Sequence, residues 1–388
     1  MDFELTEEQS AVRELCRDFA REVVAPAADV LDREHRFPYD IVRQMGEIGL
    51  FGLPFPVAWG GAGGDFLSYC IAVEEISRAD AGVGITLEAG VSLGAAPIYE
   101  YGTEEQKRRW LPDLVSGRKL WAFGLTEPGS GSDAGAIKTR ARLEDGEWVI
   151  NGAKQFITNS GTDISAGVTI TALTGSPEPA APRSEISALL VPQETTGYSV
   201  LPSYRKLGWH SSDTHPLAFD DCRVPEGNLL GKAGGGYAQF LHTLTGGRIA
   251  IAALSVGLGQ ACLDAALSYA RERQAFGAPI SRLQAIQFKL ADMATEVELA
   301  RLITYKAAVT YQQDDGRSGE VAKLASMAKL YASEASKRAA DQAVQIHGGY
   351  GFIEDYPVAR YWRDVKVNEI GEGTSEVQRM LIARALGC

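Results

Sequence analysis

Glu372 is the residue of this chain whose type and setting best suit proton transfer. It lies between Gly371 and Gly373, and residues 374–376 have the Thr-Ser-Glu pattern of a helix start. Flanking glycines let a ligand approach the backbone, and a helix N-terminus offers free N–H groups to an anion. Apolar surroundings raise the pKa of a carboxylic acid, which suits it to general-base chemistry. Taken alone, the segment is also compatible with a solvated loop before a last helix.

Four other segments have residue types that could bind a flat or phosphorylated ligand. Residues 126–133 form a glycine- and serine-rich turn whose hydroxyl and N–H groups could hold a pyrophosphate. Phe156 and Thr158 lie on one face of a predicted strand and could contact a flat ring. Residues 273–277 and 345–349 each close a predicted helix with a glycine turn. Each segment could instead be a capping or packing turn.

Composition excludes several classes of protein. The net charge of −12 argues against a nucleic-acid partner, which would require a basic face. The 5 cysteines are scattered and the 5 histidines form no ligand set, so we predict a reducing compartment and no metal site. Residues 1–5 lack the features of a signal peptide, and the most apolar run, residues 249–258, is too short to span a bilayer. We therefore expect a cytoplasmic enzyme with no membrane partner.

The elements that must position these segments fall into three zones. Residues 1–118 are predicted to be helical, with capping boxes that begin at Thr6 and Thr103. Residues 233–388 are alanine-rich and predict long helices over 237–274, 282–313 and 317–346, which suggests an antiparallel bundle.

The middle zone, residues 119–232, is predicted to be an antiparallel β domain. Asp145-Gly146 and Asn151-Gly152 are interpreted as hairpin turns between short strands. Residues 129–131 resemble a fragment of a dinucleotide fingerprint, but the required strand–turn–helix context is missing, so a Rossmann domain is excluded. A β domain between two α domains indicates a ligand site where the sheet meets the bundle.

Together these segments resemble the acyl-CoA dehydrogenase family, in particular its short-chain and bacterial branches. The resemblance covers essentially the whole chain and rests on residues 125–133, 157–159, 273–277, 345–349, 361–364 and 372–374. It implies an N-terminal α domain, a central antiparallel β-barrel and a C-terminal four-helix bundle.

The resemblance also implies FAD, held between the β domain and the bundle of a homotetramer or dimer. The implied cofactor-binding residues are Phe123, Leu125, Thr126, Gly131, Ser132, Phe156, Ile157, Thr158, Arg273, Phe276, Gln284, Gln345, Gly348, Gly349, Thr374 and Glu376. Those from Arg273 to Gly349 would reach FAD from the adjoining protomer. The implied substrate-binding residues are Ser132, Thr245, Arg248, Gly371 and Gly373.

The implied reaction is α,β-dehydrogenation of a short- or medium-chain or branched acyl-CoA to a trans-2-enoyl-CoA. Glu372 would remove the α proton while the β hydrogen leaves as hydride to flavin N5, and an electron-transferring flavoprotein would accept the electrons. The Glu372 N–H and a flavin hydroxyl would stabilise the carbonyl oxygen. Two alternatives remain open: an acyl-CoA oxidase that uses O₂, and a non-catalytic flavin or acyl-CoA binding protein. An intact Glu372 argues against the latter.

Four positions depart from the family pattern. Gly247 stands where some members keep their base, so Glu372 is the single candidate. Gly371 replaces a common tyrosine, which predicts room for a branched or bulkier acyl chain. Phe156 replaces the usual tryptophan at the flavin edge, and Thr245 replaces a common aspartate.

Overall fold

The N-terminal part of the chain is helical. The computed structural model describes residues 4–175, 185–314, 316 and 318–388. The signal-peptide prediction made for residues 1–5 therefore falls partly outside the described residues. The first helices are α1 (Glu7–Phe19), the π-helical turn η1 (Ala20–Val24), α2 (Ala25–Glu34), α3 (Tyr39–Glu47) and α4 (Phe66–Ala79). They are followed by α5 (Ala81–Glu88), the π-helical turn η4 (Ala89–Ala95), α6 (Ala96–Tyr101) and α7 (Glu104–Val115).

Both predicted capping boxes are present. The Thr6 hydroxyl accepts the Gln9 N–H at 3.2 Å, and the Thr6 N–H donates to the Gln9 side chain at 3.0 Å. Thr103 and Gln106 make the same pair of hydrogen bonds at the start of α7. These bonds satisfy N–H groups that have no partner inside the helix.

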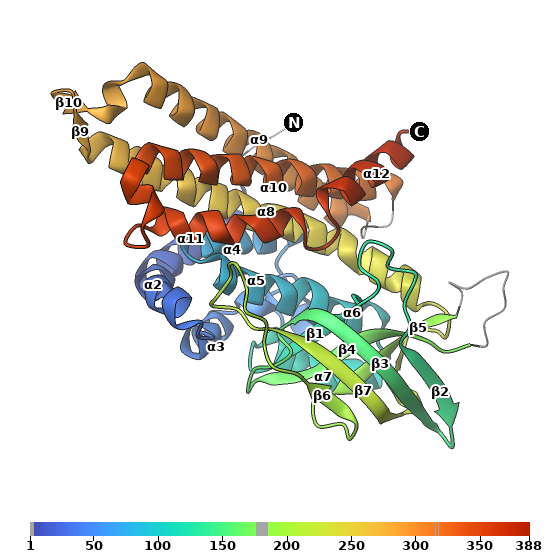
Figure 1. The fold of residues 1–388 in the computed structure, drawn as a ribbon. Helices are drawn as coiled ribbons and strands as arrows, with labels where there is room; N and C mark the ends of the chain where they lie inside the picture. The colour runs from blue at the N-terminus through green and yellow to red at the C-terminus, as the bar shows by residue number, and fades with distance from the viewer. Residues whose placement is uncertain (1–3, 176–184, 315, 317) are drawn as a thin grey trace.

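The described part of the middle zone forms one sheet of eight strands, which lies below the helical bundle in Figure 1. Its members are β1 (Leu120–Gly124), β2 (Arg140–Glu144), β3 (Glu147–Thr158), β4 (Ser165–Leu173), β5 (Ile186–Pro192), β6 (Tyr198–Val200), β7 (Thr214–Pro225) and β8 (Leu229–Leu230). The order is β6-β7-β3-β2-β4-β5-β8, and β1 pairs with β4. The β1–β4 pair is parallel, so the sheet is mixed and not purely antiparallel as predicted.

One predicted turn is wrong. Asp145-Gly146 does connect β2 to β3, and both residues have the positive φ that such a turn requires. Asn151-Gly152 instead lies inside β3, at an irregularity in its pairing with β7. The long antiparallel contact with β7 keeps the chain extended through a dipeptide that would favour a turn in isolation.

The C-terminal part is a helical bundle built around one long helix. Its elements are α8 (Gly236–Glu272), β9 (Gln274–Ala275), β10 (Ala278–Pro279), α9 (Gln284–Asp314), α10 (Gly319–His347), η7 (Gly348–Phe352), α11 (Pro357–Asp364), η8 (Val365–Glu369) and α12 (Ser375–Ala385). Helix α8 packs against α10, α9 and α4 and also contacts β5 (Figure 1). One apolar core therefore joins both helical parts, while the sheet has a second, smaller core.

The connections between the three parts are short. Strand β1 begins at Leu120 and helix α8 at Gly236, so the predicted boundaries at residues 118 and 232 fall in connecting segments and stay a prediction. In the described part of the chain, Ala81–Tyr101 and Gly236–Glu272 are long and apolar enough to cross a membrane, but most of each apolar stretch is buried inside the protein.

Candidate active site

Glu372 lies in a backbone conformation that the surrounding side chains must hold. Its φ is 54°, in the left-handed region, and the φ of Gly373 is 97°. A non-glycine residue in this region is unusual and persists where neighbouring contacts fix it. The Glu372 carbonyl accepts from Arg248 Nε at 3.3 Å and Gln378 Nε2 at 3.2 Å. The Gly373 carbonyl accepts from Gln378 Nε2 and Lys329 Nζ, both at 2.9 Å.

The carboxylate of Glu372 is buried. Neither of its oxygens accepts a hydrogen bond from an N–H or hydroxyl group of the described residues, and the side chain that interacts with it is another carboxyl group, Glu88. Burial raises the pKa of Glu372 to about 7, against the opposing effect of the positive charges on Arg248 and Lys329. A buried carboxylate with a pKa near neutrality has the properties of a general base.

Gly247 on α8 makes room for this carboxylate. A Cβ at position 247 would overlap Glu372 Oε2. The Glu372 side chain therefore occupies the space beside α8 at this position.

A second buried carboxyl group, which the sequence analysis missed, faces Glu372. Glu88 is the last residue of α5, directly before the π-helical turn η4, and its side chain is fully buried. The Ser92 hydroxyl donates to Glu88 Oε1, while Oε2 has no partner among the described residues. Burial, and then the negative charge of Glu372, raises the pKa of Glu88 well above its usual value.

The predicted flavin-edge residues gather where β1 and β3 end. Thr126 O accepts the Gln155 N–H at 2.8 Å, which fixes the chain after β1 against β3. Phe156 has a φ of 62°, and this interruption of the strand leaves its ring 59 % exposed. Ile157 is buried and Thr158 is half-buried. The left-handed backbone conformation at Phe156 therefore directs its side chain outward. The regular alternation of side chains along a strand does not account for this exposure.

A buried ion pair supports this edge of the sheet. Lys154 Nζ donates to Glu127 Oε1 at 2.8 Å and to the Leu125 carbonyl at 3.2 Å. Both charged side chains are buried. Glu127 in turn accepts the N–H groups of Lys138 and Thr139, so the start of the glycine-rich turn is attached to β3.

Helix α8 brings the sheet edge and Glu372 together. Phe123 on β1 stacks on Phe240 of α8, with ring centroids 4.0 Å apart. Gly247 follows two helical turns later, about 10 Å along the axis. A flat ligand at the ends of β1 and β3 would therefore have Glu372 within one molecule's length.

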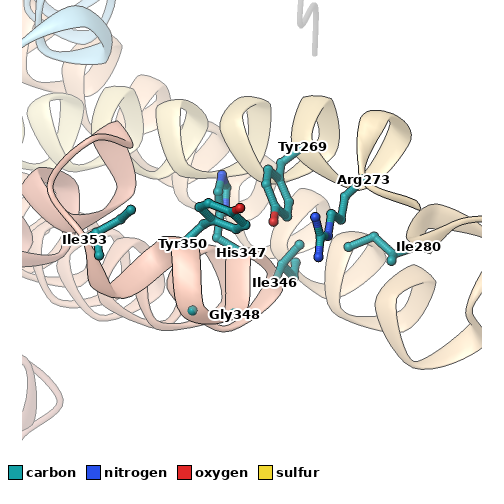
Figure 2. A pocket seen from close by; sticks show the side chains of 9 residues that line it. Tyr269, Arg273, Ile280, Ile346, His347, Gly348, Tyr350 and Ile353 are labelled. Atoms are coloured by element: carbon teal, nitrogen blue, oxygen red, sulfur yellow. The ribbon is translucent and has the colours of Figure 1, made fainter. Parts of the chain in front are cut away.

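The other predicted cofactor residues lie at the far end of α8. Arg273, Phe276, Gln284, Gln345, Gly348 and Gly349 come from the α8–α9 connection and the end of α10. A cavity of about 510 Å³ opens here, lined by residues that include Tyr269, Arg273, His347 and Tyr350 (Figure 2). Arg273 lies 5.6 Å from the centre of the Tyr350 ring, and Phe276 is 94 % exposed.

One dinucleotide cannot contact both groups within a single chain. Gly247 and Arg273 are separated by roughly 39 Å along the helix axis. The structure thus divides the predicted cofactor residues into two sets, one beside Glu372 and one remote from it.

Both sets have surfaces suited to FAD. A Cβ built on Gly131, Gly348 or Gly349 would meet no heavy atom within 4 Å, so these backbones are open to a ligand. Thr374 caps α12, its hydroxyl accepting the Val377 N–H at 3.3 Å, and Glu376 is exposed beside it. These open turns and the exposed Phe156 ring fit the phosphate and ring portions of such a cofactor.

The predicted substrate-binding residues are less closely grouped. Arg248 and Thr245 are buried on α8, and Arg248 touches the Glu372 carbonyl. Ser132 is exposed in the turn after β1. A Cβ built on Gly371 would meet only the Val367 carbonyl, at 3.5 Å, so there is open space next to the backbone at this position.

An α–β–α chain with a buried carboxylate, an aromatic sheet edge and open glycine turns has the parts of a flavin-dependent dehydrogenase. Models of the N-terminal, middle and C-terminal domains of acyl-CoA dehydrogenases match residues 6–118, 122–222 and 234–387. The chain belongs to the acyl-CoA dehydrogenase family. The predicted three-part fold is therefore confirmed, the chain is an oxidoreductase acting on acyl-CoA, and its cofactor is FAD.

Individual relatives agree with this assignment. The chain is 51 % identical to the probable acyl-CoA dehydrogenase YngJ of Bacillus subtilis, over 100 % of both chains. It is 46 % identical to the mitochondrial short-chain specific acyl-CoA dehydrogenase of Mus musculus, covering 98 % of this chain and 90 % of that one.

Solved structures are similarly close. The butyryl-CoA dehydrogenase of Megasphaera elsdenii superposes with a TM-score of 0.95 at 41 % identity over 100 % of both chains. A chain in the study of the electron transferring flavoprotein of Acidaminococcus fermentans has a TM-score of 0.95 at 42 % identity, covering 100 % of this chain and 99 % of that one. An acyl-CoA dehydrogenase of Bacillus anthracis complexed with FAD has a TM-score of 0.91 at 34 % identity, covering 99 % of this chain and 67 % of that one.

Proposed function

We propose that this enzyme converts a short or branched acyl-CoA to its trans-2-enoyl-CoA, with Glu372 as the base. The observation that carries the proposal is the buried carboxylate, held by a left-handed turn and without an N–H or hydroxyl partner on either oxygen among the described residues. A carboxylate that served only the fold would be paired, because an unpaired buried polar group is costly. An incoming C–H group can take the place that a partner would have filled.

Two groups of Glu372, its carboxylate and its backbone N–H, take part in proton removal. Glu372 takes the α proton, which the neighbouring thioester makes weakly acidic. The Glu372 N–H, which has no acceptor among the described residues, stabilises the negative charge that develops on the thioester oxygen. The acceptor for the β hydrogen, which leaves as hydride, would be supplied by bound FAD. The buried setting excludes water from the reacting atoms.

The open space at Gly371 supports a short or branched acyl group. An acyl chain that branches near the thioester needs width beside the base, and a side chain at position 371 would occupy that width. The similarity to short-chain specific and butyryl-CoA dehydrogenases supports the same size range. The similarity to a chain in the flavoprotein study supports an electron-transferring flavoprotein as the acceptor.

Anaerobic mixing with a series of acyl-CoAs tests the proposal. We expect short and α-branched acyl-CoAs of about four or five carbons to bleach the flavin absorbance, and long straight-chain acyl-CoAs to bleach it much more slowly. Failure of every acyl-CoA to bleach the flavin would refute dehydrogenation. Bleaching followed by rapid peroxide formation in air would identify an oxidase instead.

The rate of bleaching should depend on pH with a single rising limb near pH 7. Glu372 must be ionised to accept a proton, and burial raises its pKa to about 7. The rate should therefore fall about tenfold for each pH unit below 7 and level off above it. Stopped-flow measurements from pH 5.5 to 9 check this expectation, and a rate constant that does not change with pH would contradict it.

We further propose that FAD is shared between two copies of the chain in a dimer or tetramer. The support is the separation of the two sets of cofactor residues along α8, together with the exposed Phe276 ring beside the remote cavity. Analytical ultracentrifugation of the holoenzyme should show a species of at least two chains. Full FAD occupancy in a monomeric species would exclude a shared site.

A further inference from the structure

We propose that Lys329 is a positioning residue for the base: its ammonium group holds the backbone directly after Glu372 and places a positive charge behind that carboxyl. The inference rests on the proposed role of Glu372 and assigns a specific part to a residue on a different helix. Lys329 lies near the middle of α10, and its side chain is fully buried.

The geometry places this ammonium group directly behind the catalytic turn. Lys329 Nζ donates a hydrogen bond to the carbonyl oxygen of Gly373, the residue after Glu372, at 2.9 Å. On the stripe of α10 that Lys329 shares, the neighbouring buried residues are small, among them Ala325, Ala332 and Ser333. A lysine in such a stripe is costly to bury, because desolvation disfavours an ammonium ion without a compensating charge.

Anchoring of the turn does not by itself require this lysine. Gln378, which is fully buried, donates to the same Gly373 carbonyl at 2.9 Å and to the Glu372 carbonyl at 3.2 Å. A neutral amide therefore already satisfies both carbonyl groups. Lys329 differs from Gln378 in that it also places a positive charge at the turn.

The charged groups around Glu372 determine how the positive charge of Lys329 affects its ionisation. Glu372 is faced by Arg248 from α8, Lys329 from α10, and the carboxyl of Glu88 from α5. Tyr69 of α4 is the other titratable group influenced by Glu372, and it is buried with its hydroxyl bonded to the Glu88 carbonyl. The two cations oppose the desolvation that would otherwise keep Glu372 protonated.

Lys329 itself stays charged in this setting. Burial lowers its pKa to about 8, while the negative charge of Glu372 has the opposite effect. Arg248 lowers the pKa of Lys329, and the carboxylates of Glu369 and Glu334 raise it. At neutral pH most Lys329 side chains are therefore protonated, and their positive charge favours release of the proton from Glu372.

Two substitutions separate charge from anchoring. Lys329→Gln keeps a donor for the Gly373 carbonyl without the charge, and Lys329→Met removes both. Removing a positive neighbour raises the pKa of a carboxylate, so in both variants the rising limb of the rate profile should move to higher pH, by about one unit or more. Lys337→Met is the control, because Lys337 lies on the same helix, is partly exposed and pairs with Asp341 at 2.9 Å.

Infrared titration provides a measurement that does not depend on turnover. The carboxylic acid band that disappears in Glu372→Gln reports the protonation of Glu372 directly. It should titrate at higher pH in both Lys329 variants and unchanged in Lys337→Met, with FAD content and thermal midpoint recorded for each protein.

The outcomes distinguish the two proposals. A band and a rate limb at the wild-type pH in both Lys329 variants would overturn the role of the charge. A loss of rate in Lys329→Met at every pH, with wild-type behaviour in Lys329→Gln, would also overturn it and leave Lys329 as an anchor alone. Activity retained in Glu372→Gln would instead refute the assignment of the base, whatever the Lys329 variants do.

Discussion

Glu372→Gln should lower the rate of anaerobic flavin bleaching by short acyl-CoAs by about 100- to 10,000-fold. The amide has almost the same shape as the carboxylate but cannot accept the α proton, and positioned acid–base groups contribute rate factors of this size. FAD should stay bound, because the two sets of cofactor residues do not depend on the carboxylate. Stopped-flow bleaching and the flavin-to-protein absorbance ratio measure the two quantities.

The matched control for this substitution is Glu320→Gln. Glu320 lies at the exposed start of α10 and pairs with Lys323 at 2.6 Å, far from the site in sequence and role. Its rate should equal that of the wild type. If Glu372→Gln bleached at a rate within about threefold of the wild type, another residue would have to be the base.

Gly247→Ala should lower the same rate by about 100-fold while the protein stays folded. The added methyl group would overlap Glu372 Oε2, so the carboxylate must turn away from its position. Misplacement of a reacting group by about 1 Å can cost a factor of this size. Alanine favours a helix interior over glycine by about 1 kcal/mol, so a fall in activity without a lower thermal midpoint separates misplacement from unfolding.

Gly259→Ala provides the comparison on the same helix. There the new methyl group would meet a Val297 methyl at 3.2 Å and Ser336 at 3.5 Å, away from Glu372. Bleaching by this variant should be unchanged. Equal rates for Gly247→Ala and the wild type would mean that the carboxylate does not react from its position against α8.

Local signals in the sequence predicted the fold well where neighbouring residues decide the conformation. The capping boxes at Thr6 and Thr103 form because their partners lie three positions away. The three long helices of the bundle follow from their high content of alanine, which has the strongest helix propensity. Asn151-Gly152 was predicted wrongly, because pairing with β7, about 70 residues further along the chain, outweighs the local preference for a turn.

The candidate site was predicted only in part, for the same reason. Glu372 was recognisable from its flanking glycines, whereas Glu88, Lys329 and Gln378 meet it from separate elements. A weak signal did exist, since Glu88 and Lys329 are single charges within otherwise small or apolar helical stretches. Periodicity shows that such residues are buried, but which charges face one another depends on the packing of α5, α8 and α10.

The length of α8 has a genetic consequence if FAD is shared as proposed. Each chain would contribute the part of α8 near Gly247 to one active site and the segment around Arg273 to another. An allele defective in Glu372 and an allele defective in the Arg273 cavity would then damage different halves of a composite site. Hybrid oligomers would contain some sites with two intact halves, so co-expression of the two alleles would restore part of the activity that neither has alone.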